Sequence, residues 1–384
     1  MIHLSQRLPA DLSDSPFFSE LAKAKREVKD YIDLTVSSPL KTGLSFDLAS
    51  AVEASKGKWD CWNPDSSGAI FAREAVARYY AERGGFFDAG HILLTASTSE
   101  AYSIIFKTLC EAGDSILTPL PGYPLLDALA GLEYLDTAPY FLKRCGDKWV
   151  LDEDSLYSFP ERSRILLIVS PHNPTGHSIS HKEWDLAVEF ASENDLAIVV
   201  DEVFGDFIYD KSVERPWMWD SKDVPVFFLN GLSKTVGSPE LKLGWMAYRE
   251  GELKGELKRA LEYVADAYLS VSSPAFALAP QMLAISKDYE QSIIDRAKRN
   301  LQVLRSAFPS KGIFPDVQGG WYAAIHFEGA DDERLTLKLL RDAKVLVQPG
   351  FFFDFDEDGW IVLSLLLETD SFEKAVNGIH LTLD

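Results

Sequence analysis

The sequence predicts an α/β protein with two parts: a three-layer α/β/α large domain whose sheet is mostly parallel, and a smaller α+β domain. Between about residues 90 and 280, short apolar runs alternate with amphipathic helical stretches, which is typical of a doubly wound sheet. After residue 280 the expected strands are fewer and lie among helices. The length of 384 residues is enough for two domains, at about 100–200 residues each.

Six short runs are the expected strands of the large domain, which we place at residues 46–280. Several are apolar almost throughout, as parallel strands are when helices cover both faces of a sheet. The expected strands are residues 92–95, 115–118, 164–170, 197–201, 226–230 and 244–248, and the expected helices are residues 99–112, 125–132 and 182–194.

The smaller domain is expected to combine residues 1–45 with residues 281–384. The first segment contains a helical stretch and then an extended one, and the second begins with a long helical stretch. The expected helices are residues 16–28, 287–307, 331–342 and 371–380, and the expected strands are residues 321–326, 345–348 and 360–366.

Composition and charge exclude several classes of protein. The chain is 46% hydrophobic and 25% charged, as ordinary globular proteins are. Its formal net charge is −21, so we expect it to bind neither nucleic acid nor an anionic membrane. No stretch of about 18 apolar residues is present, so no membrane span is expected.

The cysteines and the first residues indicate a compartment. Cys61, Cys110 and Cys145 show no paired spacing, which argues against a disulfide framework or a cysteine-based metal site and favours a reducing compartment. The first residues lack the apolar core of a secretory signal peptide. We therefore expect a soluble, cytoplasmic protein without a bound metal.

Polar residues follow four of the expected strands. In open α/β sheets, ligands bind beyond the carboxyl ends of the parallel strands. We therefore expect hydroxyls, an amide, a carboxylate and an amine to face one crevice. The residues at these positions are Ser97, Thr98, Ser99, Asn173, Asp201, Ser233 and Lys234.

Taken singly, each of these features also has a purely structural explanation. The sequence Asn-Pro-Thr-Gly at residues 173–176 is typical of a turn. Ser97 and Glu100 have the spacing of a capping box, which starts a helix. Lys234 could be a solvated surface lysine, as most lysines are. The order and spacing of the whole set are more specific than any one member.

Motifs in a characteristic order extend over most of the chain. Asn173 and Asp201 are 28 residues apart, and Asp201 and Lys234 are 33 residues apart. The motifs are Trp62-Asn63-Pro64, Ala72-Arg73-Glu74-Ala75, Pro121-Gly122-Tyr123-Pro124, Asn173-Pro174-Thr175-Gly176, Asp201-Glu202-Val203-Phe204, Ser233-Lys234 with Gly244-Trp245, and Pro349-Gly350. This set closely resembles the class I/II aminotransferase family, the fold-type I enzymes that use pyridoxal 5'-phosphate.

The resemblance implies a role for each central residue. Lys234 matches the catalytic lysine, which forms a Schiff base with the cofactor and then carries protons at the substrate carbon. Asp201 matches the carboxylate that keeps the pyridine nitrogen protonated, so that the ring accepts electrons. Asn173 matches the amide donor to the cofactor's phenolate oxygen, and Tyr123 matches the aromatic ring that stacks on the cofactor.

The resemblance also implies a phosphate site and a substrate residue. Helix N-termini bind phosphate through free N–H groups and hydroxyls, and residues 97–99 would supply both, with Ser233 adding another hydroxyl. Lys242 stands where the family usually has arginine; it keeps the charge near the phosphate but loses the bidentate fork. Trp321 falls where the family often places a residue that lines the substrate pocket.

Three further positions depart from the family pattern. Phe204 replaces a common tyrosine and cannot donate a hydrogen bond to the phenolate oxygen. Trp62 replaces a tyrosine that, in many members, reaches the phosphate of the neighbouring subunit. Val362 replaces the arginine that grips the substrate's α-carboxylate, and residues 345–373 contain no arginine or lysine. Either the substrate lacks that carboxylate, or another basic residue such as Lys41 reaches in.

We therefore expect an aminotransferase that moves an amino group from an amino donor to a keto acid, with an atypical carboxylate site, and by resemblance a homodimer. The alternative is a C–S β-lyase or a decarboxylase on the same cofactor, because His172-Asn173-Pro174 also occurs in the C–S lyase branch. A ligand-sensing domain of a DNA-binding regulator is disfavoured, because the net charge opposes DNA binding and no helix-turn-helix precedes the enzyme-like region.

Overall fold

The computed structural model describes residues 3–9, 12–13, 15–59, 64–209, 216–221, 224–269, 271–309 and 314–383. Cys61 and the motif residues Trp62 and Asn63 lie outside these ranges. In the described chain, one large sheet contains the strands β2 (Ile92–Thr95), β3 (Ser115–Leu120), β4 (Asp136–Cys145), β5 (Lys148–Leu151), β6 (Ser163–Val169), β7 (Ala197–Asp201), β8 (Val226–Gly231) and β9 (Gly244–Arg249).

The large sheet is mixed but mostly parallel, as predicted. Its strand order is β2-β9-β8-β7-β6-β3-β4-β5. The neighbours from β8 to β4 are parallel, whereas β9 is antiparallel to both β2 and β8, and β5 is antiparallel to β4. The carboxyl ends of the central strands therefore meet at one edge of the sheet.

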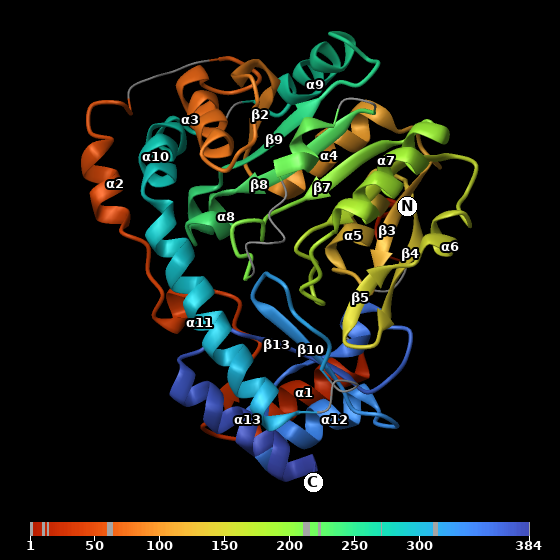
Figure 1. The fold of residues 1–384 in the computed structure, drawn as a ribbon, viewed down its shortest axis with the longest axis vertical. Helices are drawn as coiled ribbons and strands as arrows, with labels where there is room; N and C mark the ends of the chain where they lie inside the picture. Colours follow the sequence, from red (N-terminus) through yellow and green to blue (C-terminus); the bar gives the residue numbers. More distant parts are fainter. Residues whose placement is uncertain are drawn as a thin grey trace.

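Helices cover both faces of the large sheet (Figure 1). One face carries α2 (Leu48–Ala54), α3 (Ile70–Ala81), α7 (His181–Glu193) and α10 (Ser273–Ala284), and the other carries α4 (Thr98–Leu109), α5 (Leu125–Leu132) and α9 (Glu256–Asp266). In β6, Leu166 and Ile168 point into the first core, whereas Ile165 and Leu167 point into the second. A strand buried on both sides must be apolar throughout, and this explains the continuous runs in the sequence.

The predicted strands of this layer are all present, but the sequence reasoning missed some elements. Strands β4 and β5 were not predicted, because residues 136–145 include Pro139 and several charged side chains, and their burial alternates as expected near a sheet edge. Helices α2, α3, α9 and α10 were not predicted either. Two short helices, α6 (Glu153–Leu156) and α8 (Leu232–Thr235), complete the layer.

The C-terminal part of the chain forms a second group of elements with the N-terminal part. The strands are β1 (Ile32–Asp33), β10 (Tyr322–His326), β11 (Val345–Leu346), β12 (Gln348–Pro349) and β13 (Trp360–Ser364), and the helices are α1 (Pro16–Glu27), α11 (Ser286–Ala307), α12 (Asp332–Lys338) and α13 (Thr369–Leu383). Strand β13 lies between β10 and β12 in an antiparallel sheet, and β1 pairs with β11.

Apolar contacts hold the two chain ends together in this group. Phe17 and Leu21 of α1 pack against Leu337 of α12 and Leu340 of the turn that follows it, and Figure 1 shows α1 beside α12 and α13. The single strand expected at 345–348 is wrong, because β11 pairs with β1 whereas β12 pairs with β13. The exact domain limits stay a prediction. No helix in the described ranges combines the length and apolar character of a membrane span.

Candidate active site

The carboxyl ends of the parallel strands border a cavity of about 280 Å³. Strands β6, β7 and β8, helix α4 and strand β10 all contribute residues to its wall. Eight of the predicted site residues line it, and they come from widely separated parts of the sequence. These residues are Ser97, Thr98, Ser99, Tyr123, Asn173, Asp201, Ser233 and Lys234.

Helix α4 begins at this cavity. The Ser97 side chain caps it by accepting a hydrogen bond from the Glu100 N–H at 3.2 Å. The Glu100 carboxylate accepts a hydrogen bond from the Ala96 N–H, one residue before the cap, so the expected capping box is shifted by one residue. The hydroxyls of residues 97–99 reach the cavity at the positive end of the helix dipole. Such a helix start can hold an anion.

Two glycines let the sheet approach the start of α4. A Cβ atom on Gly244 would lie 2.9 Å from the carbonyl carbon of Ser97, and one on Gly231 would lie 2.9 Å from the Cα of Gly244. Any side chain at either position would push β9 away from the helix. The glycines therefore keep the hydroxyls of residues 97–99 and the residues that follow β8 around one cavity.

Asp201 is the last residue of β7 and receives two hydrogen bonds. The Tyr102 hydroxyl donates to Oδ2 at 2.8 Å, and the Val203 N–H donates to Oδ1 at 3.2 Å. Burial raises the pKa of Asp201, whereas these two donors and the positive charge of Lys234 oppose the rise. The carboxylate is thus held in a fixed orientation in a poorly solvated place.

Lys234 lies on α8, directly after β8. Its Nζ is 5.0 Å from the centre of the Trp321 ring and 5.6 Å from the centre of the Phe204 ring. Burial lowers the pKa of Lys234, and the charge of Asp201 opposes this effect. A lowered pKa increases the fraction of neutral amine, which is the form that attacks a carbonyl carbon.

Asn173 and Tyr123 lie on the remaining wall of the cavity. The Asn173 Oδ1 is buried and finds no hydrogen-bond partner among the described residues. An unmet acceptor in a cavity wall indicates capacity for a hydrogen-bond donor on a bound group. Tyr123 follows β3 and keeps 47% of its surface exposed, so its ring is accessible from the cavity.

Three residues singled out from the sequence lie elsewhere. The Lys242 side chain is exposed and does not line the cavity, so its contact with a phosphate stays a prediction. Trp321 is fully buried behind Lys234 and packs on Phe204, with ring centres 5.0 Å apart. Val362 is fully buried in an apolar cluster with Trp360 and other residues.

The sequence reasoning missed several residues of the cavity wall. Tyr102 lies one helical turn after Thr98, and this spacing on α4 could have indicated it. Ser37 and Tyr322 line the cavity from the N-terminal and C-terminal parts of the chain, and no motif marks them. The apolar members of the wall that were also missed include Leu125, Leu126 and Leu129.

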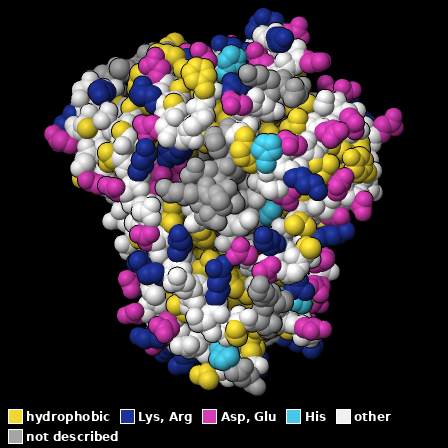
Figure 2. All heavy atoms as spheres, in the orientation of Figure 1, with side chains coloured by type: hydrophobic (Ala, Val, Ile, Leu, Met, Phe, Trp, Pro, Cys, Tyr) yellow, Lys and Arg dark blue, Asp and Glu magenta, His cyan; other side chains and the backbone are white. Residues whose placement is uncertain are grey.

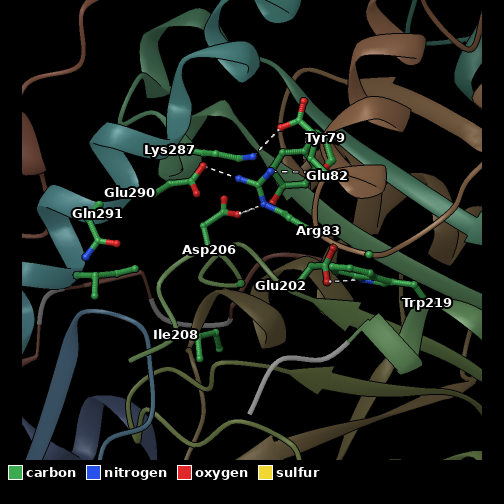
Figure 3. Close-up of a pocket in the computed structure, with 13 residues that line it drawn as sticks. Tyr79, Glu82, Arg83, Glu202, Asp206, Ile208, Trp219, Lys287, Glu290 and Gln291 are labelled. Carbon is green, nitrogen blue, oxygen red and sulfur yellow. Dashed lines mark hydrogen bonds and ion pairs between the residues drawn. The ribbon is translucent and has the colours of Figure 1, made fainter. Parts of the chain in front are cut away.

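A second, larger cavity of about 600 Å³ is lined by α3, by the residues that follow β7 and by α11 (Figure 3). Arg83 lies at its centre and donates hydrogen bonds to Asp206 at 2.9 Å and to Glu290 at 2.5 Å. The Tyr79 hydroxyl donates to the same Asp206 oxygen at 2.8 Å. Its described lining contains none of the predicted site residues. Ion pairs thus join the residues that follow α3 to α11.

The outer surface carries charges of both signs. Figure 2 shows acidic and basic side chains interspersed over the described part of one face. Across the described ranges, no group of three or more His, Cys, Asp or Glu side chains is arranged to hold a metal ion. The 280 Å³ cavity remains the place where an amine, a carboxylate, an amide and several hydroxyls converge.

Comparison with known proteins gives the same family as the motifs. The profile of the family "Aminotransferase class I and II" matches residues 29–379. The chain is 24% identical over 383 residues to the glutamate-pyruvate aminotransferase of Haemophilus influenzae, covering 94% of this chain and 92% of that protein. It is 22% identical over 361 residues to the tyrosine aminotransferase of Caenorhabditis elegans, with coverage of 90% and 77%.

A solved structure shows the same fold. The alanine aminotransferase from Pyrococcus furiosus superimposes with a TM-score of 0.88 and 24% sequence identity, over 99% of both chains. The predicted fold-type I architecture is thereby confirmed. The chain belongs to the class I and II aminotransferases, which are pyridoxal-phosphate-dependent enzymes.

Proposed function

We propose that this aminotransferase acts on an amino donor that carries no α-carboxylate where most family members bind one. One observation carries the proposal. Among the described residues that line the 280 Å³ cavity, Lys234 is the only basic one, and its amine is needed for the chemistry. The wall therefore offers no second cation to a carboxylate.

Val362 also supports this proposal, because it replaces the arginine that binds the α-carboxylate in most family members. It lies in β13, opposite Ala324 of β10 and Gln348 of β12, and no part of its side chain is exposed. Lys41, the alternative cation considered from the sequence, lies in the turn Pro39–Thr42 with an exposed side chain and does not line the cavity.

The energetics favour a carboxylate-free substrate. A carboxylate buried without a cation or several donors costs several kcal/mol, and arginine is favoured because its fork binds both oxygens. The described wall of the cavity also offers the hydroxyls of Ser37 and Tyr322 and the apolar side chains of α5. Neutral hydroxyls and leucines suit an amine with an apolar body.

The residues of the cavity fit pyridoxal phosphate by their chemistry. When bound, the cofactor supplies an electron sink for the substrate carbon. We assign to Lys234 the attachment of the cofactor and the transfer of the proton at that carbon. Asp201 keeps the ring nitrogen protonated, and Asn173 donates a hydrogen bond to the phenolate oxygen through its amide.

The phosphate and the ring face are assigned to the other side of the cavity. The hydroxyls and N–H groups of residues 97–99, with the hydroxyl of Ser233, hold the phosphate. The exposed ring of Tyr123 covers the cofactor. The close approach of Gly244 to the start of α4 supports the phosphate position, because it leaves the helix end facing the cavity.

We also propose that the protein is a homodimer. Membership of the class I and II family supports this, because its members are usually homodimers with active sites at the interface. Light scattering of the purified protein should give twice the mass of the chain. A mass of one chain at micromolar concentration would exclude a stable dimer.

The substrate proposal is tested with pairs of donors that differ only in the α-carboxylate. Suitable pairs are alanine with ethylamine, glutamate with 4-aminobutyrate, aspartate with β-alanine and phenylalanine with phenethylamine. We expect kcat/KM to be equal or higher for the carboxylate-free member of each pair. The Lys234→Ala protein is the control for any reaction that does not require the side-chain amine of Lys234.

Two outcomes would contradict the proposal. Transamination of glutamate or alanine with kcat/KM of about 10⁴ M⁻¹s⁻¹ or more would show that an unidentified residue binds the carboxylate. Release of a thiol and ammonia from a thioether amino acid, without amino transfer, would indicate the C–S lyase reaction instead.

A further inference from the structure

Among the described residues, one side chain donates a hydrogen bond to Asp201. Its Oδ1 accepts a backbone hydrogen bond from the Val203 N–H at 3.2 Å, whereas its Oδ2 accepts the Tyr102 hydroxyl at 2.8 Å. The charged and titratable groups that face it are Tyr102 from α4 and Lys234 from α8. Within the described part of the chain, Tyr102 is therefore the one side chain that donates a hydrogen bond to this carboxylate.

Tyr102 is held firmly by its surroundings. It is 3% exposed, and its ring packs against Phe106 one turn further along α4, with ring centres 5.9 Å apart. Burial and the nearby Asp201 raise the pKa of the Tyr102 phenol well above its ordinary value. The hydroxyl consequently stays protonated, and it can act only as a donor toward Oδ2.

Tyr102 also lies on the helix that begins at the proposed phosphate site. Thr98 and Tyr102 are four residues apart, so they lie on the same face of α4. Both line the 280 Å³ cavity. One rigid helix therefore sets the distance between the group that would hold the phosphate and the group that orients Asp201.

We propose that Tyr102 is a positioning residue that holds Asp201 ionised and aimed at the cofactor's ring nitrogen, so that the proton stays on the ring. The inference rests on the proposed role of Asp201. A hydrogen bond to a carboxylate stabilises its ionised form, and the bonded carboxylate takes a proton less readily. Without the phenol, the proton shared with the ring nitrogen moves toward Asp201, and the ring becomes a weaker electron sink.

The test compares two substitutions that each remove one buried phenolic hydroxyl. Tyr102→Phe removes the donor to Asp201. Tyr140→Phe is the matched control, because Tyr140 is equally buried and its hydroxyl donates at 2.8 Å to the carbonyl of Leu167 and not to Asp201. Both proteins are loaded with pyridoxal phosphate labelled with ¹⁵N in the ring, and Asp201→Asn serves as the reference for a ring without its carboxylate.

The expected result separates positioning from stability. In Tyr102→Phe the ¹⁵N signal should move from the wild-type position toward that of Asp201→Asn, and kcat should fall about tenfold to a hundredfold with a smaller change in KM, as expected for a lost hydrogen bond to a charged group. Tyr140→Phe should keep the wild-type ¹⁵N signal even if its melting temperature falls.

The outcomes distinguish this inference from the proposed function. A Tyr102→Phe signal that coincides with wild type, while that of Asp201→Asn moves, would overturn the role of Tyr102 alone. An unchanged signal in Asp201→Asn would overturn the role of Asp201 as well.

A second probe covers the possibility that Tyr102→Phe does not fold. Placing 3-fluorotyrosine at position 102 alone keeps the ring and makes the hydroxyl a stronger donor. It should move the ring ¹⁵N signal further from that of Asp201→Asn, and no change or a move toward that signal would contradict the proposal.

Discussion

Two adjacent carboxylates at the end of β7 have opposite surroundings. Asp201 points toward α4, where it receives one side-chain hydrogen bond and lines the 280 Å³ cavity. Glu202 points toward α3 and is 2% exposed. Its carboxylate accepts the Tyr80 hydroxyl at 2.7 Å and the Trp219 indole N–H at 3.0 Å. The same kind of group, one residue apart, thus has a different environment on each face of the sheet.

The difference shows how surroundings divide the roles of two acids. On the side of Glu202, the buried carboxylates have donors from the protein itself: Tyr80 and Trp219 donate to Glu202, and Arg83 pairs with Asp206 and Glu290 beside it (Figure 3). On the side of Asp201, the amine of Lys234 and the amide of Asn173 face open space in the cavity. The first side is built to hold elements together, and the second keeps polar groups available for a ligand.

Each cavity has one lysine in its described wall, Lys234 or Lys287. Replacing Lys234 gives the largest expected effect on turnover. Lys234→Ala should lower turnover by about 10⁴-fold or more, because it removes both the nucleophile and the proton carrier. Lys287→Ala, in the wall of the other cavity, removes an exposed ion pair with Glu82 and should leave turnover within about twofold, as exposed pairs contribute little. Steady-state assays with a donor found active for the wild type decide the matter, and comparable losses in both variants would refute the division of roles.

The paired carboxylates give the next largest effect. Asp201→Asn should reduce turnover by about 10²- to 10⁴-fold, the range of an acid–base contribution, with little change in melting temperature. Glu202→Gln should leave turnover nearly unchanged and lower the melting temperature. It replaces one carboxylate oxygen by an amide N–H₂ that faces one of the two donors, which costs about 1–3 kcal/mol of stability for an unmet donor. Activity per folded molecule and thermal unfolding are measured for both, and an inactive but stable Glu202→Gln would contradict the comparison.

The Arg83 cluster predicts a dependence of stability on pH. Burial and the neighbouring Asp206 raise the pKa of Glu290 from its ordinary 4.5 to about 7. Because the folded chain then binds more protons than the unfolded chain between these values, this group's contribution to stability is present at low pH and lost as the pH rises through about 7. Glu290→Gln should therefore gain stability relative to wild type between pH 5 and pH 8, by about 3 kcal/mol at most.

The measurement is thermal unfolding of both proteins at pH 5 and pH 8 in the same salt. Asp185→Asn, which removes an exposed carboxylate on α7, is the control for a change of net charge. A difference between wild type and Glu290→Gln that stays constant with pH would show that Glu290 does not titrate in this range.

The smallest expected effect concerns Phe204, which lines the 280 Å³ cavity. Phenylalanine donates no hydrogen bond to the cofactor's phenolate oxygen, whereas a tyrosine would stabilise that anion. The absorbance change of the lysine-bound cofactor should therefore occur at a higher pH in wild type than in Phe204→Tyr. Spectral titration of the two proteins checks this, and an equal or higher value in the tyrosine variant would contradict it.

The elements that position the site could be predicted because local patterns specify them. Strands β2 and β7 match the expected residues, since both are short apolar runs bounded by turns. The residues at their carboxyl ends could be predicted to converge, because parallel strands end at one edge. The expected capping residue, Ser97, does start α4.

Other features depend on contacts between distant residues and leave no local pattern. Arg83 pairs with residues 123 and 207 positions further along the chain. The hydrogen bond from Tyr102 to Asp201 spans 99 positions. Lys242 has an exposed side chain and a left-handed backbone, with φ of 50°. That conformation is uncommon for a lysine, and spacing alone does not predict it.

The central claim is that the cavity on the Asp201 side of β7 holds the cofactor on Lys234. The most direct test is reduction of the loaded wild-type protein with borohydride, followed by digestion and mass spectrometry of the modified peptide. We predict that the reduced cofactor is found on Lys234, at about one group per chain, and that Lys234→Ala carries none. Modification of another lysine, such as Lys242 or Lys287, would contradict the account.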